Sequence, residues 1–267
     1  MCGYFGYSRS AYYKSLRVQE NEILSESLIL DMVRRERCLQ PRLGGKKLYW
    51  MLGSDIRSIF PHFGRDKFFS LLRRNDLLVE RKRQYHKTTH SYHHFHKYGN
   101  LIKDFCVVRP NQVWVSDITY LRTEKGFVYL SLLTDMYSRK IVGWSISNSL
   151  SIEVCVDALK NALQENHIQL PLIHHSDRGI QYCSHAYVNI LKNNEISISM
   201  TEDNHCYENA MAERVNGILK DEYLLDRTFK NLAHAQKACK EAVMLYNTRR
   251  PHWSLKFKTP EQMHNAA

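Results

Sequence analysis

A run of eleven residues from His174 to Ser184, HHSDRGIQYCS, gathers several side chains that carry out chemistry in proteins. It is compatible with three kinds of site: a hydrolytic cluster of Ser, His and Asp, a metal site of His and Cys, or a single carboxylate at a strand end. The preceding residues LPLI are apolar and favour a short buried strand, and Arg178 and Gly179 favour a tight turn. Under the third interpretation, Asp177 is the functional residue.

Two further acidic residues stand at positions suited to catalysis. Asp117 lies within the apolar run VWVSDITYL, where a buried charge is costly unless it meets a cation or another partner. Glu213 lies in NAMAERVNGILK, which is expected to form a helix with Glu213 and Lys220 on one side. Taken singly, Asp177 could be a turn residue and Glu213 a surface charge. Taken together, the three carboxylates favour a site for hard divalent cations, which can act in pairs at a phosphodiester.

The elements that would position these residues can be read from the hydrophobic pattern. Three segments rich in Val, Ile, Tyr and Trp, joined by short turns, predict an antiparallel meander over residues 112–121, 126–137 and 139–147. Helices are then expected at 151–166, 184–194, 209–225 and 233–247, with strands at 170–176 and 196–200. This order predicts a mixed α/β sheet covered by helices.

The first two fifths of the chain have a different character. Of the 38 Lys and Arg residues, 21 lie in residues 1–110, which hold 10 acidic residues, so the whole net charge of +11 falls there. Residues 20–75 show helical spacing with one basic face, which suits a small helix-turn-helix-like unit or an ordinary helical bundle. We therefore predict a basic helical DNA-binding region at 1–80, a basic linker at 81–110 and a catalytic unit at 111–267.

The linker is rich in histidine, and two interpretations of it remain open. His86, His90 and His94 are four residues apart, and His93 and His96 lie beside them, so the cluster could bind zinc. It could instead be a charged segment that lies along DNA. The seven cysteines are scattered without a CxxC pair, which disfavours both a disulfide framework and a four-cysteine zinc site.

The overall composition excludes other classes of protein. The chain has 267 residues, 43% of them hydrophobic, and 24% charged, which is typical of a folded protein. It contains no apolar run near the length of a transmembrane helix and no apolar segment like that of a signal peptide at its start. We therefore expect no membrane partner and a cytoplasmic location.

Several motifs in a fixed order resemble one known superfamily. They are WVSDITY, YLSLLTDMYSRKIVGW, HSDRGIQYCS, CYENAMAE, GILKDE and YNTRRPH. From Asn111 to about Pro260 the chain resembles the catalytic core of DDE transposases and retroviral integrases, and 35 residues separate Asp177 from Glu213, the spacing after which that superfamily is named. Within it, the chain closely resembles the second-frame transposase of bacterial insertion sequences of the IS-three group.

The resemblance implies a fold, a reaction and a set of roles. It implies an RNase H-like core that uses Mg²⁺ or Mn²⁺, as two ions held by Asp117, Asp177 and Glu213. Water would first cleave DNA at the element end, and the freed 3′-hydroxyl would then join to a second strand, so that neither Ser176 nor Cys183 acts as a nucleophile. His175 is a candidate to orient the Asp or meet a phosphate. The candidate DNA contacts are Arg178, Lys220, Arg249, Arg250, Arg73, Arg74, Arg81, Lys82 and Arg83.

The resemblance also implies partners: DNA at the element ends and at the target, further copies of the chain, and the product of an upstream reading frame. This places the protein in the bacterial cytoplasm, at the nucleoid. Glu202 and Asp203 form an acidic loop where the family often carries basic residues and glycine. The alternatives are a non-catalytic DNA-binding regulator of transposition and an RNase H-like nuclease with another substrate.

Overall fold

A computed structural model of the chain describes residues 4, 6, 8–80, 94–166, 168, 170–202 and 209–266. The chain divides into two compact units, residues 1–81 and 82–267, and each is described by itself. Within the described residues, no helix combines the length and the apolar character needed to cross a membrane.

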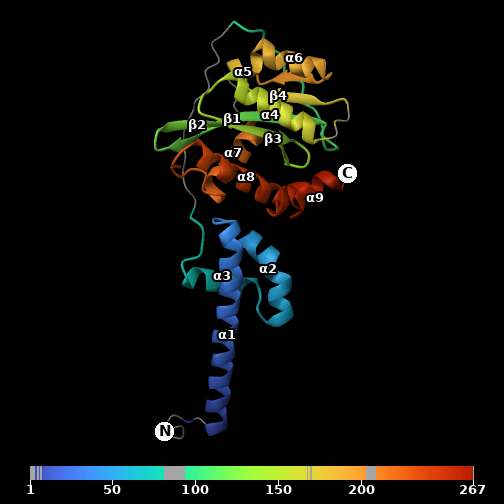
Figure 1. Ribbon diagram of the computed structural model, residues 1–267. Helices are drawn as coiled ribbons and strands as arrows, with labels where there is room; N and C mark the ends of the chain where they lie inside the picture. Colours follow the sequence, from blue (N-terminus) through green and yellow to red (C-terminus); the bar gives the residue numbers. More distant parts are fainter. Residues whose placement is uncertain are drawn as a thin grey trace. The chain divides into compact units, whose positions relative to one another are not determined.

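The first unit is built from three helices (Figure 1). They are α1 (Arg9–Leu39), α2 (Gly45–Ile59) and α3 (Arg65–Arg74). A small core joins the second half of α1 to α2 and α3, with Ile29 and Val33 of α1 fully buried. The first half of α1 has no buried residue, and it begins earlier than the sequence pattern predicts because the Ser8 side chain accepts a hydrogen bond from the Ala11 amide at 3.0 Å. The predicted basic helical region is thus confirmed as helical.

The second unit is organised around a five-stranded sheet in the order β3-β2-β1-β4-β5. The strands are β1 (Val113–Thr123), β2 (Gly126–Asp135), β3 (Ile141–Ser147), β4 (Ile173–Ser176) and β5 (Ser197–Met200). The first three pair antiparallel as a meander, and β4 adds to β1 in parallel, with β5 parallel to β4. The predicted mixed sheet and its antiparallel meander are therefore confirmed, and β1 lies at the centre.

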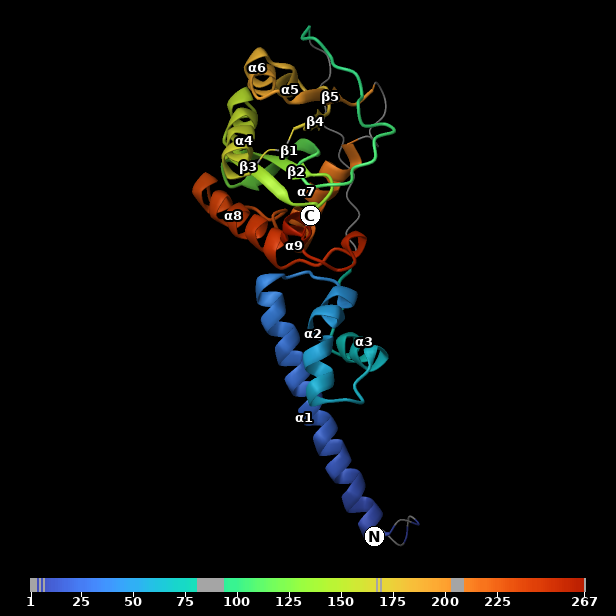
Figure 2. The same cartoon turned by 90° about the vertical axis from the view of Figure 1, so that its right-hand side faces the viewer.

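Helices cover both faces of this sheet (Figures 1 and 2). One face packs against α4 (Ile152–Glu165), α5 (Ile180–Cys183) and α6 (His185–Asn193). The other packs against α7 (Ala210–Glu222) and α8 (Leu232–Thr248). A 3₁₀ turn (Trp253–Leu255) and α9 (Pro260–Asn265) follow α8. The predicted helices between the strands are confirmed, whereas α5 is too short to show a periodic pattern.

The contact between β3 and α4 depends on a residue without a side chain. A Cβ atom on Gly143 would overlap the carbonyl oxygen of Ala158 and the side chain of Ala162, and backbone atoms in a helix cannot move aside cheaply. By contrast, a Cβ on Gly217 in α7 would meet nothing within 4 Å. The two glycines therefore have opposite roles, one permitting close packing and the other weakening a helix.

Gly143→Ala should lower the free energy of unfolding by about 1–3 kcal/mol, because the added methyl group overpacks the β3–α4 contact. Gly217→Ala is the matched control and should raise it by about 0.5–1 kcal/mol, because alanine is the better helix former. Urea unfolding of both variants tests this. A Gly143→Ala protein as stable as the wild type would contradict the packing described here.

Candidate functional site

The pairing of β1 with β4 brings two of the acidic residues to the same level of the sheet. Val115 lies opposite His175 in this parallel pair, and Asp117 and Asp177 each come two residues later. Asp177 follows the last residue of β4, at the carboxyl end of the strand, where open α/β sheets bind ligands. Adjacent parallel strands thus present two carboxylates side by side.

The turn after β4 fixes the Asp177 side chain. Its Oδ1 atom accepts a hydrogen bond from the Gly179 amide at 3.0 Å. A Cβ atom on Gly179 would lie 3.0 Å from the same oxygen, although the φ angle of −65° at this glycine is open to any residue. A side chain at this position would therefore crowd the carboxylate and shift it by a few tenths of an ångström, whereas the backbone conformation does not demand glycine.

Helix α7 is attached to β1 beside Asp117 by two asparagines. The Asn209 side-chain amide donates to the Ser116 carbonyl at 3.1 Å, and the Asn216 side-chain amide donates to Asp117 Oδ2 at 2.8 Å. Glu213 lies four residues after the first and three before the second, so all three share one face of the helix. The helix therefore turns Glu213, whose side chain is exposed, toward the side that carries the two aspartates.

The electrostatics show that the three carboxylates influence one another. Burial raises the pKa of Asp117 to about 7, with a further increase from the negative charge of Asp177 and a smaller one from Glu213. The hydrogen bonds from Asn216 and the Ile118 amide act in the opposite direction. Burial and then Asp177 also raise the pKa of Glu213. A bound cation would relieve this repulsion.

The residues fit a hard cation in the chemistry of their donors. Carboxylate oxygens are what Mg²⁺ and Mn²⁺ prefer, and the buried Oδ1 of Asn216, next to Asp117, has no hydrogen-bond partner. In the part of the chain that the structure describes, however, no three His, Cys, Asp or Glu side chains converge closely enough to hold one ion. The site has suitable oxygen donors, but among the described residues they do not converge on one position that an ion could occupy.

The other side chains of HHSDRGIQYCS are structural. His174 Nε2 lies 2.9 Å from both Ser116 Oγ and Tyr187 Oη, in the interior. His175 is also fully buried, and its Nδ1 lies 2.8 Å from Ser199 Oγ, so the expectation that it meets a phosphate is wrong. The hydrolytic and His/Cys interpretations fail because these histidines face the core.

Ser176 and Cys183 also belong to the interior. Ser176 is fully buried at the end of β4, and Cys183 in α5 lies with its sulfur 3.6 Å from the sulfur of Met200. Burial raises the pKa of the Cys183 thiol to about 11, so it stays protonated near neutral pH. Neither side chain is suited to attack a substrate.

One predicted DNA contact must be corrected. Arg250 is 3% exposed, and its Nε and Nη2 donate to both carboxylate oxygens of Glu222 at 2.7 and 2.8 Å. Its Nη1 lies 2.8 Å from Nε2 of His252. Arg250 is therefore a buried structural cation that joins α7 to the end of α8, and it is not available to a phosphate. The ion pair could not be predicted from the sequence because Glu222 lies 28 residues before Arg250.

The other basic candidates have different surroundings. Lys220 shares the α7 face of Asn216, and its ammonium lies 4.5 Å from the centre of the Tyr120 ring. Burial lowers the Lys220 pKa, while Asp117 opposes that change. Arg178 is half-buried directly after Asp177, and Arg249 is exposed at the end of α8. These positions leave Lys220, Arg178 and Arg249 as proposed phosphate contacts.

In the first unit, Arg73 is exposed on α3, whereas Arg74 lies 2.6 Å from the carboxylate of Glu26 on α1. Three further predicted contacts, Arg81, Lys82 and Arg83, lie outside the described residues.

The histidine cluster and the acidic loop each lie partly outside the described residues. His94 and His96 are described and take part in no metal-binding group of described residues, whereas His86, His90 and His93 lie outside them. Glu202 of the acidic loop lies 3.6 Å from the ammonium of Lys103, and Asp203 also lies outside the described residues.

Asn216 was not singled out by the sequence motifs. Its helical spacing places it on the same face as Glu213, and this was the one feature that could have identified it. The sequence does not show which strand an asparagine on that face will contact.

Comparisons with known proteins agree with the motifs. Two family models, both described as an integrase core domain, match residues 107–206 and 194–260. The insertion element IS600 uncharacterized 31 kDa protein of Shigella sonnei is 34% identical over 260 residues, which cover 94% of this chain and 93% of that protein. Transposase InsF for insertion sequence IS3A of Escherichia coli (strain K12) is 38% identical over 152 residues, 57% of this chain and 53% of InsF. The match therefore spans about half the length of InsF.

A solved structure shows the same fold. The simian T-cell lymphotropic virus intasome, in complex with PP2A regulatory subunit B56 gamma, matches with a TM-score of 0.52 and 17% identity. The match covers 84% of this chain and 75% of that chain. At this identity the likeness shows the fold alone. Together with the family models, it confirms the predicted integrase-type, RNase H-like core and the resemblance read from the motifs.

Asn216→Ala should weaken Mn²⁺ binding by about 10- to 100-fold, because outer partners of metal-binding carboxylates typically contribute this much. The variant loses the 2.8 Å hydrogen bond that orients Asp117. Titration followed by the electron paramagnetic resonance of free Mn²⁺ measures the affinity. Asn194→Ala, which changes an exposed asparagine at the end of α6, is the control. Equal affinity in all three proteins would show that Asn216 does not orient a ligand.

The buried ring of His174 should lower the free energy of unfolding at acidic pH. Burial, with a smaller contribution from His175, lowers the pKa of His174 to about 3, so the folded chain keeps this ring neutral where the unfolded chain, with a pKa near 6.5, takes up a proton. The contribution is fully present above about pH 6.5 and is lost progressively as pH falls toward about 3, by roughly 2 kcal/mol at pH 5. Urea unfolding of wild type and His174→Gln at pH 8 and pH 5 should show a smaller pH effect in the variant. Identical pH effects would contradict a buried neutral ring.

Proposed function

Because the chain belongs to the integrase core family of insertion-sequence transposases, we propose that its acidic cluster cuts and joins DNA strands at the ends of an insertion sequence. The protein is a DDE-type polynucleotidyl transferase of DNA transposition. We assign the catalytic roles to Asp117, Asp177 and Glu213. The observation that carries this assignment is the half-buried carboxylate of Asp117 in the central strand, oriented by Asn216 and destabilised by partial burial and by the charge of Asp177.

The three carboxylates would hold two divalent cations, Mg²⁺ or Mn²⁺. When bound, these ions supply Lewis-acid stabilisation of the charge that builds on phosphate oxygens. The protein's own contribution is position. Asp117 is oriented by the Asn216 amide and Asp177 is held by the Gly179 amide, while Glu213 is exposed on α7. The two aspartates, fixed in this way, cost little reorganisation at the moment of reaction.

The reaction consists of two displacements at phosphorus. Water first cleaves a phosphodiester and leaves a 3′-hydroxyl, and that hydroxyl then attacks a second phosphodiester and joins the strands. Neither displacement requires a covalent bond to the enzyme, and the buried positions of Ser176 and Cys183 agree with this. We also assign to Lys220, whose ammonium lies over the Tyr120 ring, a contact with a DNA phosphate beside the cluster.

The partners follow from the reaction. DNA is the substrate, both at the element ends and at the target, and the net charge of +11 favours its binding. We propose that α3 and the basic segment after it contribute contacts through Arg73, Arg81, Lys82 and Arg83. We also propose that the protein acts in the bacterial cytoplasm as an oligomer, with the upstream-frame product as a further partner.

Asp177→Asn should reduce strand transfer by at least about 100-fold, because losing a metal-binding carboxylate costs no less than losing its outer partner. Asparagine keeps an oxygen that can accept from the Gly179 amide, so the turn should remain intact. The measurement is joining of a labelled 3′-end to target DNA with Mg²⁺ or Mn²⁺. Asp157→Asn, the same change on the exposed side of α4, is the control. Equal product from Asp177→Asn and wild type would reject the assignment, whereas no product from the wild type itself would favour a regulatory DNA-binding protein.

A further inference from the structure

The loop between α8 and α9 presents an aromatic side chain to solvent. Trp253 is 70% exposed, and no other tryptophan among the described residues exceeds 50%. The ring of Phe257 lies 5.1 Å from it, centre to centre, at an interplanar angle of 71°. Exposing an indole is unfavourable unless something covers it. This loop, residues 251–259, is called the tryptophan loop below.

The tryptophan loop is held in one conformation by its backbone. The Phe257 amide donates to the His252 carbonyl at 2.8 Å, and the His252 amide donates to the Lys258 carbonyl at 3.1 Å. Lys256 and Phe257 have φ angles of 53° and 64°, in the left-handed region that costs such residues about 1–2 kcal/mol each. Neighbouring contacts must therefore hold the loop in this strained shape.

The start of the tryptophan loop is tied to α7. The Arg250–Glu222 ion pair fixes the residue before Pro251, and His252 packs edge-on against the Tyr246 ring with centres 5.1 Å apart. Because Arg250 is buried and bound to both carboxylate oxygens, this anchor is far stronger than a surface ion pair.

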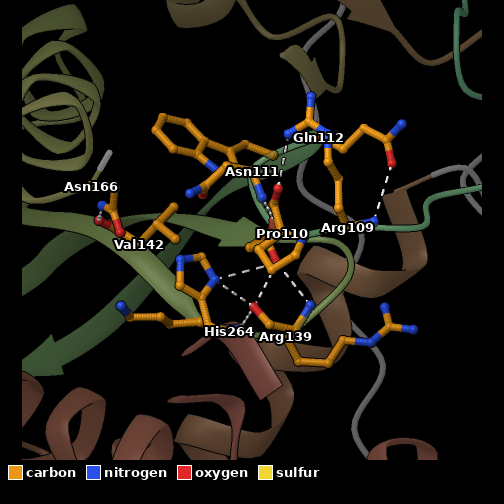
Figure 3. Close-up of polar contacts among 12 residues, drawn as sticks. Arg109, Pro110, Asn111, Gln112, Arg139, Val142, Asn166 and His264 are labelled. Carbon is orange, nitrogen blue, oxygen red and sulfur yellow. Dashed lines mark hydrogen bonds and ion pairs between the residues drawn. The ribbon is translucent and has the colours of Figure 1, made fainter. Parts of the chain in front are cut away.

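The end of the tryptophan loop is tied to the sheet through α9. Thr259 and Gln262 form a capping box that starts the helix. From its last turn, His264 Nδ1 lies 3.0 Å from Ser138 Oγ, which in turn donates to the buried carboxylate of Asp135. Figure 3 shows the His264 ring pointing toward the segment of Pro110 and Asn111. Both ends of the loop are thus fixed to the catalytic unit.

Positive charge surrounds the exposed indole. Residues 249–258 contain four basic residues and no acidic one. Arg250 is neutralised by Glu222, which leaves Arg249, Lys256 and Lys258, all exposed. A rigid aromatic face with cations around it is complementary to a chain of phosphates that carries flat, apolar bases. Base–aromatic stacking beside a basic surface is how single-stranded nucleic acid is commonly bound.

We propose that the tryptophan loop is a stacking platform for an unpaired nucleobase of the DNA substrate, with Trp253 against the base and Lys256 and Lys258 near the adjoining phosphates. This rests on the proposed function for the identity of the substrate. The anchor residue Glu222 lies nine residues after Glu213 on α7, about 14 Å along the helix axis. The platform would therefore engage DNA within a few nucleotides of the catalytic cluster, where an end base costs little to unpair.

The test uses the full chain and a DNA duplex with a short single-stranded tail of mixed sequence that carries 2-aminopurine, in buffer without divalent cations. Stacking on Trp253 should quench the 2-aminopurine fluorescence. Trp253→Ala should abolish the quenching and weaken binding of the tailed duplex by about 5- to 100-fold, the range expected for one base–aromatic stack. Trp253→Phe should restore most of both. Met244→Ala, which removes a 54% exposed side chain from α8, is the control and should bind as wild type.

A second variant probes the cations. Lys256→Asn keeps a residue that tolerates positive φ but removes the charge, and it should reduce the salt dependence of binding by about one phosphate contact. Unchanged quenching and affinity in Trp253→Ala would overturn the proposal. So would an equal loss for tailed and fully paired DNA, or an effect of Trp253→Ala on self-association without one on DNA binding.

These outcomes are separable from failure of the proposed function. The binding assay needs neither metal nor catalysis, so a wild-type protein without strand transfer can still show Trp253-dependent quenching. Conversely, a protein that joins strands normally but shows no such quenching retains its function and lacks the platform.

Discussion

Much of the catalytic unit depends on one unfavourable placement, a carboxylate in the middle of the central strand. Asp117 belongs to a strand that pairs with β2 along its length and with β4 near its start, and burial is the largest cause of its raised pKa. A charge in this position has to be compensated, and the surrounding structure does so at several points. The Asn216 amide approaches it from α7, and the Ile118 amide donates to it from its own strand. Part of the cost remains, because the pKa of Asp117 stays raised, and the proposed cation would offset it.

Helix α7 combines chemistry and support in thirteen residues. One face carries Asn209, Glu213, Asn216 and Lys220 along β1. Its last residue, Glu222, binds Arg250 in a buried, bidentate pair. The same helix therefore positions a candidate catalytic carboxylate at one end and the C-terminal segment at the other. Any displacement of α7 would reach both the acidic cluster and the tryptophan loop.

The sheet was predictable because its strands carry an apolar pattern, and the formation of a strand depends mainly on residues that are close in sequence. β1, β2 and β3 are separated by turns too short for anything but antiparallel pairing, and the helices between the later strands bury regular stripes. The motifs also singled out Asp117, Asp177 and Glu213 by type, order and spacing. What they could not provide is the pairing of side chains distant in sequence. Arg250 looked like a phosphate contact until Glu222, 28 residues away, was found to enclose it. Asn216 was missed for the same reason, since its partner Asp117 is 99 residues earlier.

The continuous stripe on α7 also limits how this protein can change over evolutionary time. One inserted residue between Asn209 and Glu222 would rotate everything after it by about 100° around the helix axis. A single such event would move Asn216 off Asp117 or turn Glu222 away from Arg250, so lineages should accept substitutions on the outer side of the helix and reject changes in its length. The open space around Gly217 marks where such substitutions are free to accumulate. Selection should therefore constrain the length of α7 more strongly than the identity of most of its side chains.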